Sequence, residues 1–313
     1  MEGVIIKSTG SWYLVEIAKD NIVKARIRGK FRIYNMPLTN PVAVGDIVTV
    51  KKEEKSEAYQ IIKFGKRKNY IIRQSSRRKH KLHILAANID KALVFVTIKY
   101  PNLKPSFIDR FLLMTEPFDI PVTIVVNKKD LYGPKELELF EEIREVYEDI
   151  GYEVILISSI EDDKETFVEL LKDNITLLSG HSGVGKSTFI NRILPELGLK
   201  TLEISDFSGK GKHTTTFAQM YPLDFGGAVI DTPGIKSLSY NHLEIEDVRH
   251  NFREFFKLSR DCKFNNCTHR NEPNCAVKEA LEAGEIYPNR YFSYLSILED
   301  IEEQNYWERH TEF

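Results

Sequence analysis

The sequence has no apolar run long enough to cross a bilayer. A helical span needs about 18 consecutive apolar residues, whereas the apolar runs in these 313 residues have the length of strands. Residues 1–10 also lack the basic-then-apolar pattern of a signal peptide. These two absences predict a cytoplasmic protein without membrane contact. Because no sequence feature indicates self-association, we expect a monomer.

Cysteine is scarce, with three residues that all fall between positions 262 and 275. Their odd number and close spacing argue against a disulfide framework and favour a metal site in a reducing compartment. Cys262, Cys267, His269 and Cys275 offer three thiolates and one imidazole, a complete tetrahedral set for one structural Zn²⁺ ion. The surroundings are polar, so we expect a small module held by metal instead of an apolar core. The alternative is three cysteines with unrelated roles.

The net charge is small, at −2, but it is unevenly distributed. Residues 63–83 contain nine Lys or Arg and no acidic residue. Such a density of like charge is self-repelling unless an anion neutralises it, and RNA phosphate is the obvious candidate. A solvated surface is the other interpretation, and both remain open. The acidic segment 136–149 has apolar residues at helical spacing, which favours a helix with a solvated face.

Residues 1–68 read as short strands separated by turns. The stretch GVIIKSTGSWYLVEI alternates apolar and polar residues, and Gly10, Gly29 and Gly45 mark turns. Four or five strands in so short a segment predict a small closed barrel of the OB type. Such barrels commonly bind single-stranded or structured RNA. A barrel with a purely structural role is the alternative.

From about residue 88 to residue 231 the pattern changes to five continuous apolar, β-branched runs. Helical patterns separate the first four runs. This alternation predicts an α/β domain with a mainly parallel sheet that helices cover on both faces. Residues 220–224, MYPLD, could add one antiparallel strand. After about residue 240 the chain becomes polar and then helical, so we divide it into domains at 1–68, 69–240 and 241–313.

A phosphate-binding loop follows the fourth of these apolar runs. Residues 180–187 match G-x-x-x-x-G-K-[ST], with a predicted strand before them and a predicted helix after them. In such a loop, backbone N–H groups surround phosphates at the positive end of the helix. We expect Lys186 to reach the outer phosphates and Ser187 to ligate Mg²⁺. The residues assigned to this loop are Gly180, His181, Ser182, Gly183, Val184, Gly185, Lys186, Ser187 and Thr188.

The segment DTPG ends the fifth apolar run. Asp231 can hold Mg²⁺ through water, and the Gly234 N–H can meet a γ-phosphate. Three adjacent threonines precede this run, and one of them would complete the Mg²⁺ shell only when the γ-phosphate is present, which makes their loop a switch. Thr215 is our choice for that ligand, with Thr214 second.

The glutamine that often follows this glycine and orients the attacking water is absent. Ile235 stands in its place and cannot bind water. His213 is the nearest polar substitute in the sequence and could orient water or shuttle a proton. A solvated loop histidine is an equally good interpretation of this residue taken alone.

The motif NKKD, comprising Asn127, Lys128, Lys129 and Asp130, ends another apolar run. One carboxylate at Asp130 can accept hydrogen bonds from both N1–H and N2–H₂ of guanine, a donor pair that adenine lacks. Lys128 can cover the base, and Asn127 can tie neighbouring loops together. A second loop on the base side follows the run EVILI, and its residues Ser158 and Ser159 would place a backbone N–H near guanine O6.

The order of these motifs is unusual. NKKD and the Ser-Ser pair precede the phosphate loop, the threonines and DTPG, whereas the phosphate loop normally comes first. A chain cut and rejoined at exposed sites keeps its contacts. The order therefore predicts a circularly permuted nucleotide-binding domain.

Nearly the whole chain resembles the RsgA family of circularly permuted, ribosome small-subunit-dependent GTPases. The resemblance rests on the barrel, LAANID at 85–90, NKKD, GHSGVGKST, KHTTT, DTPG and the Cys-Cys-His-Cys cluster in the family's order. It implies Mg²⁺-dependent GTP hydrolysis, stimulated by the small ribosomal subunit, during late maturation of that subunit. It also implies ribosomal RNA contacts through the barrel and the zinc domain, a catalytic role for His213, and Thr215 as the switch threonine. Ser159 departs from the family, where Ala is commoner, and a backbone contact should survive the change.

Two other functions remain open at this stage. A GTP-gated RNA-binding scaffold with incidental hydrolysis would explain Ile235 in place of glutamine. An ATP-dependent enzyme would share the phosphate loop but would have no use for Asp130.

Overall fold

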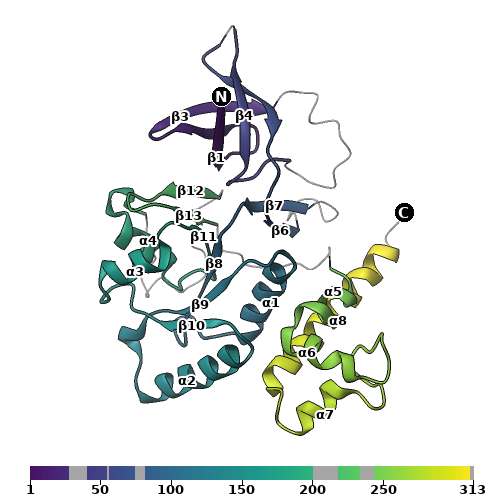
Figure 1. Ribbon diagram of the computed structural model, residues 1–313. Coiled ribbons are helices and arrows are strands. Elements are labelled where there is room, and N and C mark those ends of the chain that lie inside the picture. Colours follow the sequence, from purple (N-terminus) through teal and green to yellow (C-terminus); the bar gives the residue numbers. More distant parts are fainter. Residues whose placement is uncertain (28–40, 55, 75–81, 200–217, 233–242, 311–313) are drawn as a thin grey trace.

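The computed structural model describes residues 1–27, 41–54, 56–74, 82–199, 218–232 and 243–310 (Figure 1). Within these ranges, none of the helices combines the length and apolar character that crossing a membrane requires.

The N-terminal strands close into a barrel. They are β1 (Glu2–Ser8), β2 (Tyr13–Ala18), β3 (Asn21–Ile27), β4 (Ile47–Lys52) and β5 (Tyr59–Phe64). The order β1-β2-β3-β5-β4 becomes a ring because β4 also pairs with β1, and β3 and β5 run parallel. Alternate residues point inward, so that Ile5, Tyr13 and Val15 are buried in the barrel core. The predicted OB-type barrel is confirmed.

A β-hairpin that the sequence analysis did not predict lies between the barrel and the rest of the chain. It consists of β6 (Tyr70–Gln74) and β7 (Leu82–Ala87) and takes up part of the basic segment. Arg67 donates two hydrogen bonds to Asp46, at 2.6 and 2.7 Å. A Cβ atom on Gly45 would lie 2.0 Å from the carbonyl oxygen of Ala87, so the close approach of the two backbones requires glycine.

The second unit contributes six strands, in the order β10-β9-β8-β11-β13-β12, to a sheet that continues into the barrel where β12 pairs with β1. Its strands are β8 (Lys91–Val96), β9 (Val122–Val126), β10 (Glu153–Leu156), β11 (Ile175–Gly180), β12 (Gln219–Pro222) and β13 (Ala228–Asp231). The pairings from β10 to β13 are parallel, and β12 is antiparallel to β13. The mainly parallel sheet and its added antiparallel strand are thus confirmed.

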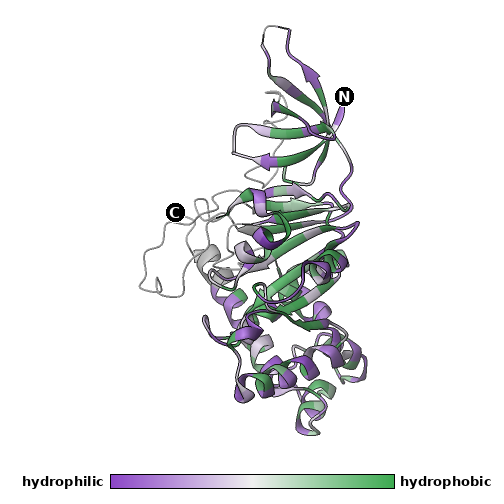
Figure 2. Cartoon of the chain, turned by 90° about the vertical axis from the view of Figure 1, so that its left-hand side faces the viewer, coloured by the Kyte–Doolittle hydropathy of each residue, from purple (hydrophilic) through white to green (hydrophobic). Residues whose placement is uncertain are grey.

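Helices cover both faces of this sheet. They are α1 (Pro105–Thr115) and α2 (Pro134–Asp149) on one face, and α3 (Lys164–Leu171) and α4 (Lys186–Ile193) on the other. Alternate residues of β8 face opposite sides of the sheet: Val94 packs with α1 and α2, whereas Phe95 packs with α3 and α4. Burial on both faces explains why these strands read as continuous apolar runs, and Figure 2 shows the strands as largely hydrophobic.

The C-terminal region is helical and packs beside α1 (Figure 1). Its helices are α5 (Ile245–Asn251), α6 (Arg253–Leu258), α7 (Ala276–Glu282) and α8 (Pro288–His310). Phe252 and Tyr294 from this region belong to the same buried apolar cluster as Phe107 and Phe111 of α1. The C-terminal helices therefore share a core with the sheet domain.

A buried ion pair also joins these two parts. The Arg290 guanidinium on α8 donates to Asp109 of α1 at 2.6 Å and to Glu254 of α6 at 2.8 Å. The Asp109 carboxylate also accepts a hydrogen bond from Tyr147 of α2 at 2.7 Å. The side chains of Arg290 and Asp109 are 4% and 1% exposed, so each charge depends on the other.

Replacing Arg290 with methionine is expected to lower the free energy of unfolding by about 3–5 kcal/mol, because the Asp109 carboxylate would stay buried without its partner. Urea unfolding followed by circular dichroism measures the change. The matched control is Arg144→Met, which removes an exposed pair with Glu141 on α2 and should change stability by less than about 1 kcal/mol. Equal effects of the two variants would contradict the prediction.

Candidate nucleotide site and metal centre

Four loops with predicted roles lie at one edge of the sheet. NKKD follows β9, Ser158 and Ser159 follow β10, the phosphate loop follows β11, and Asp231 ends β13. Because these strands are parallel, their carboxyl ends meet at the same edge, where open α/β sheets bind ligands.

Glycine is required at two positions of the phosphate loop. Gly180 and Gly185 have φ values of +147° and +97°, which side-chain-bearing residues rarely adopt. A Cβ atom on Gly180 would lie 2.5 Å from the carbonyl oxygen of Phe95. One on Gly185 would lie 2.2 Å from Nδ2 of Asn127. The loop therefore touches both β8 and the NKKD segment through its backbone.

Lys186 opens α4, and its ammonium group points back into the loop. Its Nζ donates to the carbonyl oxygens of Gly180 at 2.7 Å and His181 at 2.9 Å. Burial lowers the pKa of Lys186 to about 8, although the nearby Asp231 carboxylate opposes that shift. A phosphate group in the loop would favour the charged ammonium. Ser187 and Thr188 follow on the first turn of the same helix.

His181 connects the phosphate loop to α1. Its imidazole lies against the ring of Phe107, with 4.0 Å between the ring centroids. Burial is the main cause that lowers the pKa of His181, and the charges of Lys104 and Lys186 add to it. A neutral imidazole is thus favoured beside the phosphate loop.

Asn127 ties three of the loops together. Its Nδ2 donates to the carbonyl oxygen of Val184 in the phosphate loop at 2.9 Å. Its Oδ1 accepts from the backbone N–H and the hydroxyl of Ser159, both at 3.0 Å. The side chain is 1% exposed, so these bonds satisfy a polar group that water does not reach.

Asp130 has a partner that the sequence analysis missed. The Ser158 hydroxyl donates to Asp130 Oδ1 at 2.6 Å, and it accepts from the backbone N–H of Glu161 at 3.1 Å. The sequence predicts only a backbone N–H near guanine O6 for the Ser158–Ser159 loop, and no hydroxyl contact. The serine in the loop after β10 was visible in the sequence, but no local pattern indicates that its hydroxyl meets a carboxylate 28 residues away.

The two lysines of NKKD differ in their surroundings. Lys128 has a left-handed backbone, with φ at +70°, and its Nζ donates to the carbonyl oxygen of Tyr100 at 2.5 Å. Burial lowers its pKa, and the charge of Asp130 opposes this. Lys129 is exposed. Lys128 is therefore the lysine that the structure holds at the edge of the sheet.

Asp231 and Thr232 lie beside the phosphate loop because β13 pairs with β11. Asp231 is opposite Leu178 in the parallel register, and it is 4% exposed. The Thr232 hydroxyl donates to the Leu178 carbonyl oxygen at 3.1 Å. The predicted residues His213, Thr214, Thr215, Gly234 and Ile235 lie outside the described residues.

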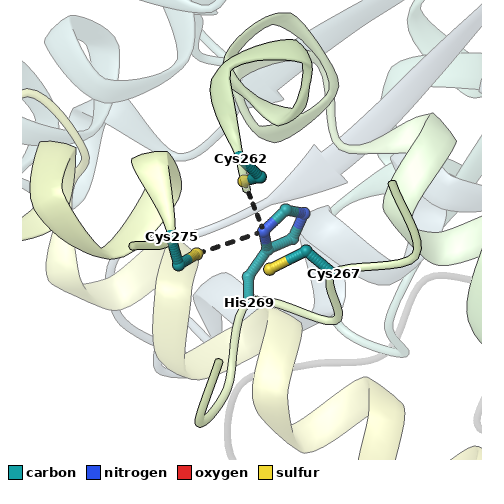
Figure 3. A group of neighbouring side chains, drawn as sticks. All are labelled: Cys262, Cys267, His269 and Cys275. Carbon is teal, nitrogen blue, oxygen red and sulfur yellow. Dashed lines mark hydrogen bonds between the residues drawn. The ribbon is translucent and has the colours of Figure 1, made fainter. Parts of the chain in front are cut away.

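The predicted metal ligands meet at one point in the C-terminal region (Figure 3). The ligand atoms of Cys262, Cys267, His269 and Cys275 all lie within 4.8 Å of one another. His269 Nδ1 is 3.7 Å from Cys262 Sγ and 3.4 Å from Cys275 Sγ. Metal–ligand distances of about 2.0–2.3 Å at tetrahedral angles place ligand atoms about 3.5 Å apart. The cluster therefore fits a tetrahedrally bound metal ion.

The expectation that metal would replace an apolar core here was wrong. All four ligand residues are buried, and the cysteines belong to the cluster that contains Phe255 and Tyr294. Hydroxyl groups from α8 also hold the ligand loop, because Tyr291 donates to the His269 carbonyl oxygen at 2.7 Å. The polar local sequence misled the prediction, since the apolar residues come from elements before and after the ligands.

Comparison with known proteins agrees with this arrangement. The model of the RsgA GTPase family matches residues 64–241, and that of the RsgA N-terminal domain matches residues 2–60. The small ribosomal subunit biogenesis GTPase RsgA of Bacteroides fragilis is 47% identical over 307 residues, which covers 98% of this chain and 99% of the relative. The protein of the same name from Flavobacterium psychrophilum is 45% identical, covering 97% of this chain and 94% of the relative.

Solved structures show the same architecture. YjeQ from Thermotoga maritima has a TM-score of 0.74 and 32% identity, covering 96% of this chain and 98% of its own. YloQ, described as a circularly permuted GTPase, has a TM-score of 0.70 and 29% identity, covering 97% of this chain and 95% of its own. With the permuted order of site loops, the five-stranded barrel and the Cys-Cys-His-Cys cluster, these matches establish that the chain is a circularly permuted GTPase of the RsgA family.

Proposed function

We propose that this protein hydrolyses GTP on the small ribosomal subunit during late maturation of that subunit. The observation that carries the proposal is the junction at Asn127, which joins the base-side loops to the phosphate loop in one site. The names of the relatives with 47% and 45% identity, which describe GTPases of small-subunit biogenesis, support the choice of partner.

We assign the nucleotide contacts as follows. Asp130 accepts from guanine, Lys128 covers the base, and Lys186 binds the outer phosphates. The remaining contacts are Asn127, Lys129, Ser158, Ser159, Gly180, His181, Ser182, Gly183, Val184, Gly185, Ser187, Thr188, Asp231 and Gly234. Mg²⁺ would accompany GTP, with Ser187 and Thr215 as its protein ligands and Asp231 holding it through water.

His213 is proposed to orient the attacking water. Ile235 cannot do so, and His213 lies next to the switch threonines in the sequence. An imidazole that is neutral at this position would accept a proton from that water as the γ-phosphoryl group leaves.

The metal in the cysteine cluster is proposed to be one structural Zn²⁺ ion. Three thiolates and one imidazole leave no open coordination position, which suits a structural rather than a catalytic role. Cys262, Cys267, His269 and Cys275 would hold it, and the ion would fix the loops between α6 and α7.

We further propose that the barrel at 1–68 and the zinc-binding region at 241–313 contact ribosomal RNA, on either side of the GTPase domain at 69–240. The basic segment 63–83 supports an RNA contact next to the barrel. The protein would act as a cytoplasmic monomer that binds GTP and GDP.

The rate of GTP hydrolysis should rise by at least about tenfold when purified small ribosomal subunits are added, because partner-stimulated GTPases gain far more than this when a partner orders the switch loops. Phosphate release under single-turnover conditions measures the rate, and large subunits serve as the control. An unchanged rate of GTP hydrolysis would contradict the proposal that the protein acts on the small subunit.

The variant His213→Ala separates this enzyme from a scaffold with incidental hydrolysis. An enzyme that uses His213 should lose about a hundredfold in stimulated rate and keep its GDP affinity. A scaffold would show the same slow rate before and after the substitution.

A further inference from the structure

The hydroxyl group of Tyr132 joins the loop after β8 to the loop after β9. The backbone N–H of Ile98 donates to it at 2.8 Å, and the hydroxyl donates to the Asn127 carbonyl oxygen at 2.5 Å. The phenol thus donates one hydrogen bond and accepts another, and the two backbone groups that it contacts belong to residues that are 6% and 1% exposed. Nothing in the sequence pattern assigns this tyrosine to the nucleotide site.

The carbonyl group that Tyr132 holds belongs to the peptide bond between Asn127 and Lys128. Lys128 adopts the left-handed conformation, with φ at +70° and ψ at +36°. The left-handed conformation costs about 1 kcal/mol in a residue that has a side chain, so it persists only where surrounding contacts stabilise it. The bond from Tyr132 fixes the orientation of the peptide plane on which this conformation depends.

Asp130 lies inside the segment that this bond closes. It is the middle residue of the short 3₁₀ turn Lys129–Leu131, and Tyr132 ends that turn by donating its backbone N–H to the Lys129 carbonyl oxygen at 3.0 Å. Tyr132 therefore contacts NKKD at two residues, Lys129 through its backbone N–H and Asn127 through its hydroxyl group. A second contact ties the same loops, from Lys128 Nζ to the Tyr100 carbonyl oxygen.

The Tyr132 hydroxyl stays protonated throughout the physiological range. Burial raises the pKa of this phenol to about 12 despite the opposing hydrogen bond from Ile98, and the charge of Asp130 adds to the increase. A neutral hydroxyl can donate to the Asn127 carbonyl, whereas a phenolate could not.

We propose that Tyr132 is a positioning residue for guanine selectivity, acting by holding the NKKD segment so that the Asp130 carboxylate meets the base. The inference rests on the proposed guanine contact of Asp130. It adds a residue outside NKKD that determines how well the site distinguishes guanine from purines with fewer donors.

The test compares two nucleotides that differ at one group. Inosine diphosphate lacks the 2-amino group of GDP and so loses one of the two donors that Asp130 accepts. Tyr132→Phe should weaken GDP binding about tenfold and inosine diphosphate binding about threefold, because a misplaced carboxylate loses most on the ligand that uses it twice. The ratio of the two affinities should therefore fall about threefold.

The matched control is Tyr287→Phe, which removes a hydroxyl that donates to Asp149 at the end of α2; Tyr287 directly precedes α8 and is far from the nucleotide-site residues in sequence. It should leave the affinity ratio unchanged. Tm and zinc content are measured for both variants, because a general loss of stability would lower both affinities equally and leave the ratio as it was.

Asp130→Asn is measured in the same series. If it loses GDP selectivity while Tyr132→Phe keeps the wild-type ratio, the positioning role is overturned and the proposed function stands. If Asp130→Asn itself leaves GDP binding intact, the proposed guanine contact is wrong, and the positioning inference falls with it.

Discussion

Replacing Asp130 with asparagine is expected to weaken GDP and GTP binding by about a hundredfold or more. The wild-type carboxylate accepts from two guanine donors, whereas an asparagine NH₂ group would face those donors with donors of its own. Sites built on such bonds discriminate by factors of about 10⁴ or more when the pairing is lost. Titration with a fluorescent GDP analogue measures the effect.

The chemistry of the base supplies a positive control for this variant. Xanthine carries a carbonyl oxygen where guanine carries its 2-amino group, so the asparagine NH₂ should recover affinity for xanthosine diphosphate. Asp163→Asn is the matched control protein, since Asp163 is an exposed residue at the start of α3 where asparagine is equally suitable. If Asp130→Asn binds GDP as tightly as the wild type, Asp130 does not select guanine, and the prediction is contradicted.

Removing the metal is expected to unfold the C-terminal region. Metal binding supplies about 10–16 kcal/mol in small zinc modules at neutral pH, which is comparable to the whole stability of a typical domain, about 5–15 kcal/mol. His269→Ala or a strong chelator should remove the ion and expose the amides of α5, α6 and α7 to hydrogen exchange. Because the cysteines share a buried cluster with Phe255 and Tyr294, the packing of α8 against α1 should also loosen.

Hydrogen exchange and zinc content test this directly. His250→Ala is the matched control, because His250 lies on α5 with about half of its side chain exposed. Its exchange pattern should match the wild type, as should that of the barrel strands in both variants. Full protection of residues 243–303 after complete loss of the metal would contradict a structural role for the ion.

Most of the fold followed from local patterns. The alternation in β1 and β2, the continuous apolar runs of β8 and β9, and the glycines of the phosphate loop each reflect a requirement of the backbone near that residue. The β6–β7 hairpin was missed because its basic composition dominated the interpretation of that segment. The apolar setting of the cysteines was missed because Phe255 and Tyr294 come from helices on either side of the ligands.

Local sequence patterns predicted only part of the candidate site. The motifs named the residues at the carboxyl edge of the sheet, and their order revealed the permutation. They did not reveal three hydrogen bonds: from Asn127 to the phosphate loop, from the Ser158 hydroxyl to Asp130, and from the Tyr132 hydroxyl to the Asn127 carbonyl oxygen.

The sequence by itself determined the class of fold, the permuted order of the loops and the donor set of the candidate metal centre. Each of these depends on spacing along the chain, which is set by backbone geometry and ligand count. Only the tertiary structure decided which side chains hold those loops in place and how the C-terminal helices join the sheet domain. The Arg290–Asp109 pair spans 181 positions, and a contact between residues so far apart leaves no periodic pattern that a single sequence can display.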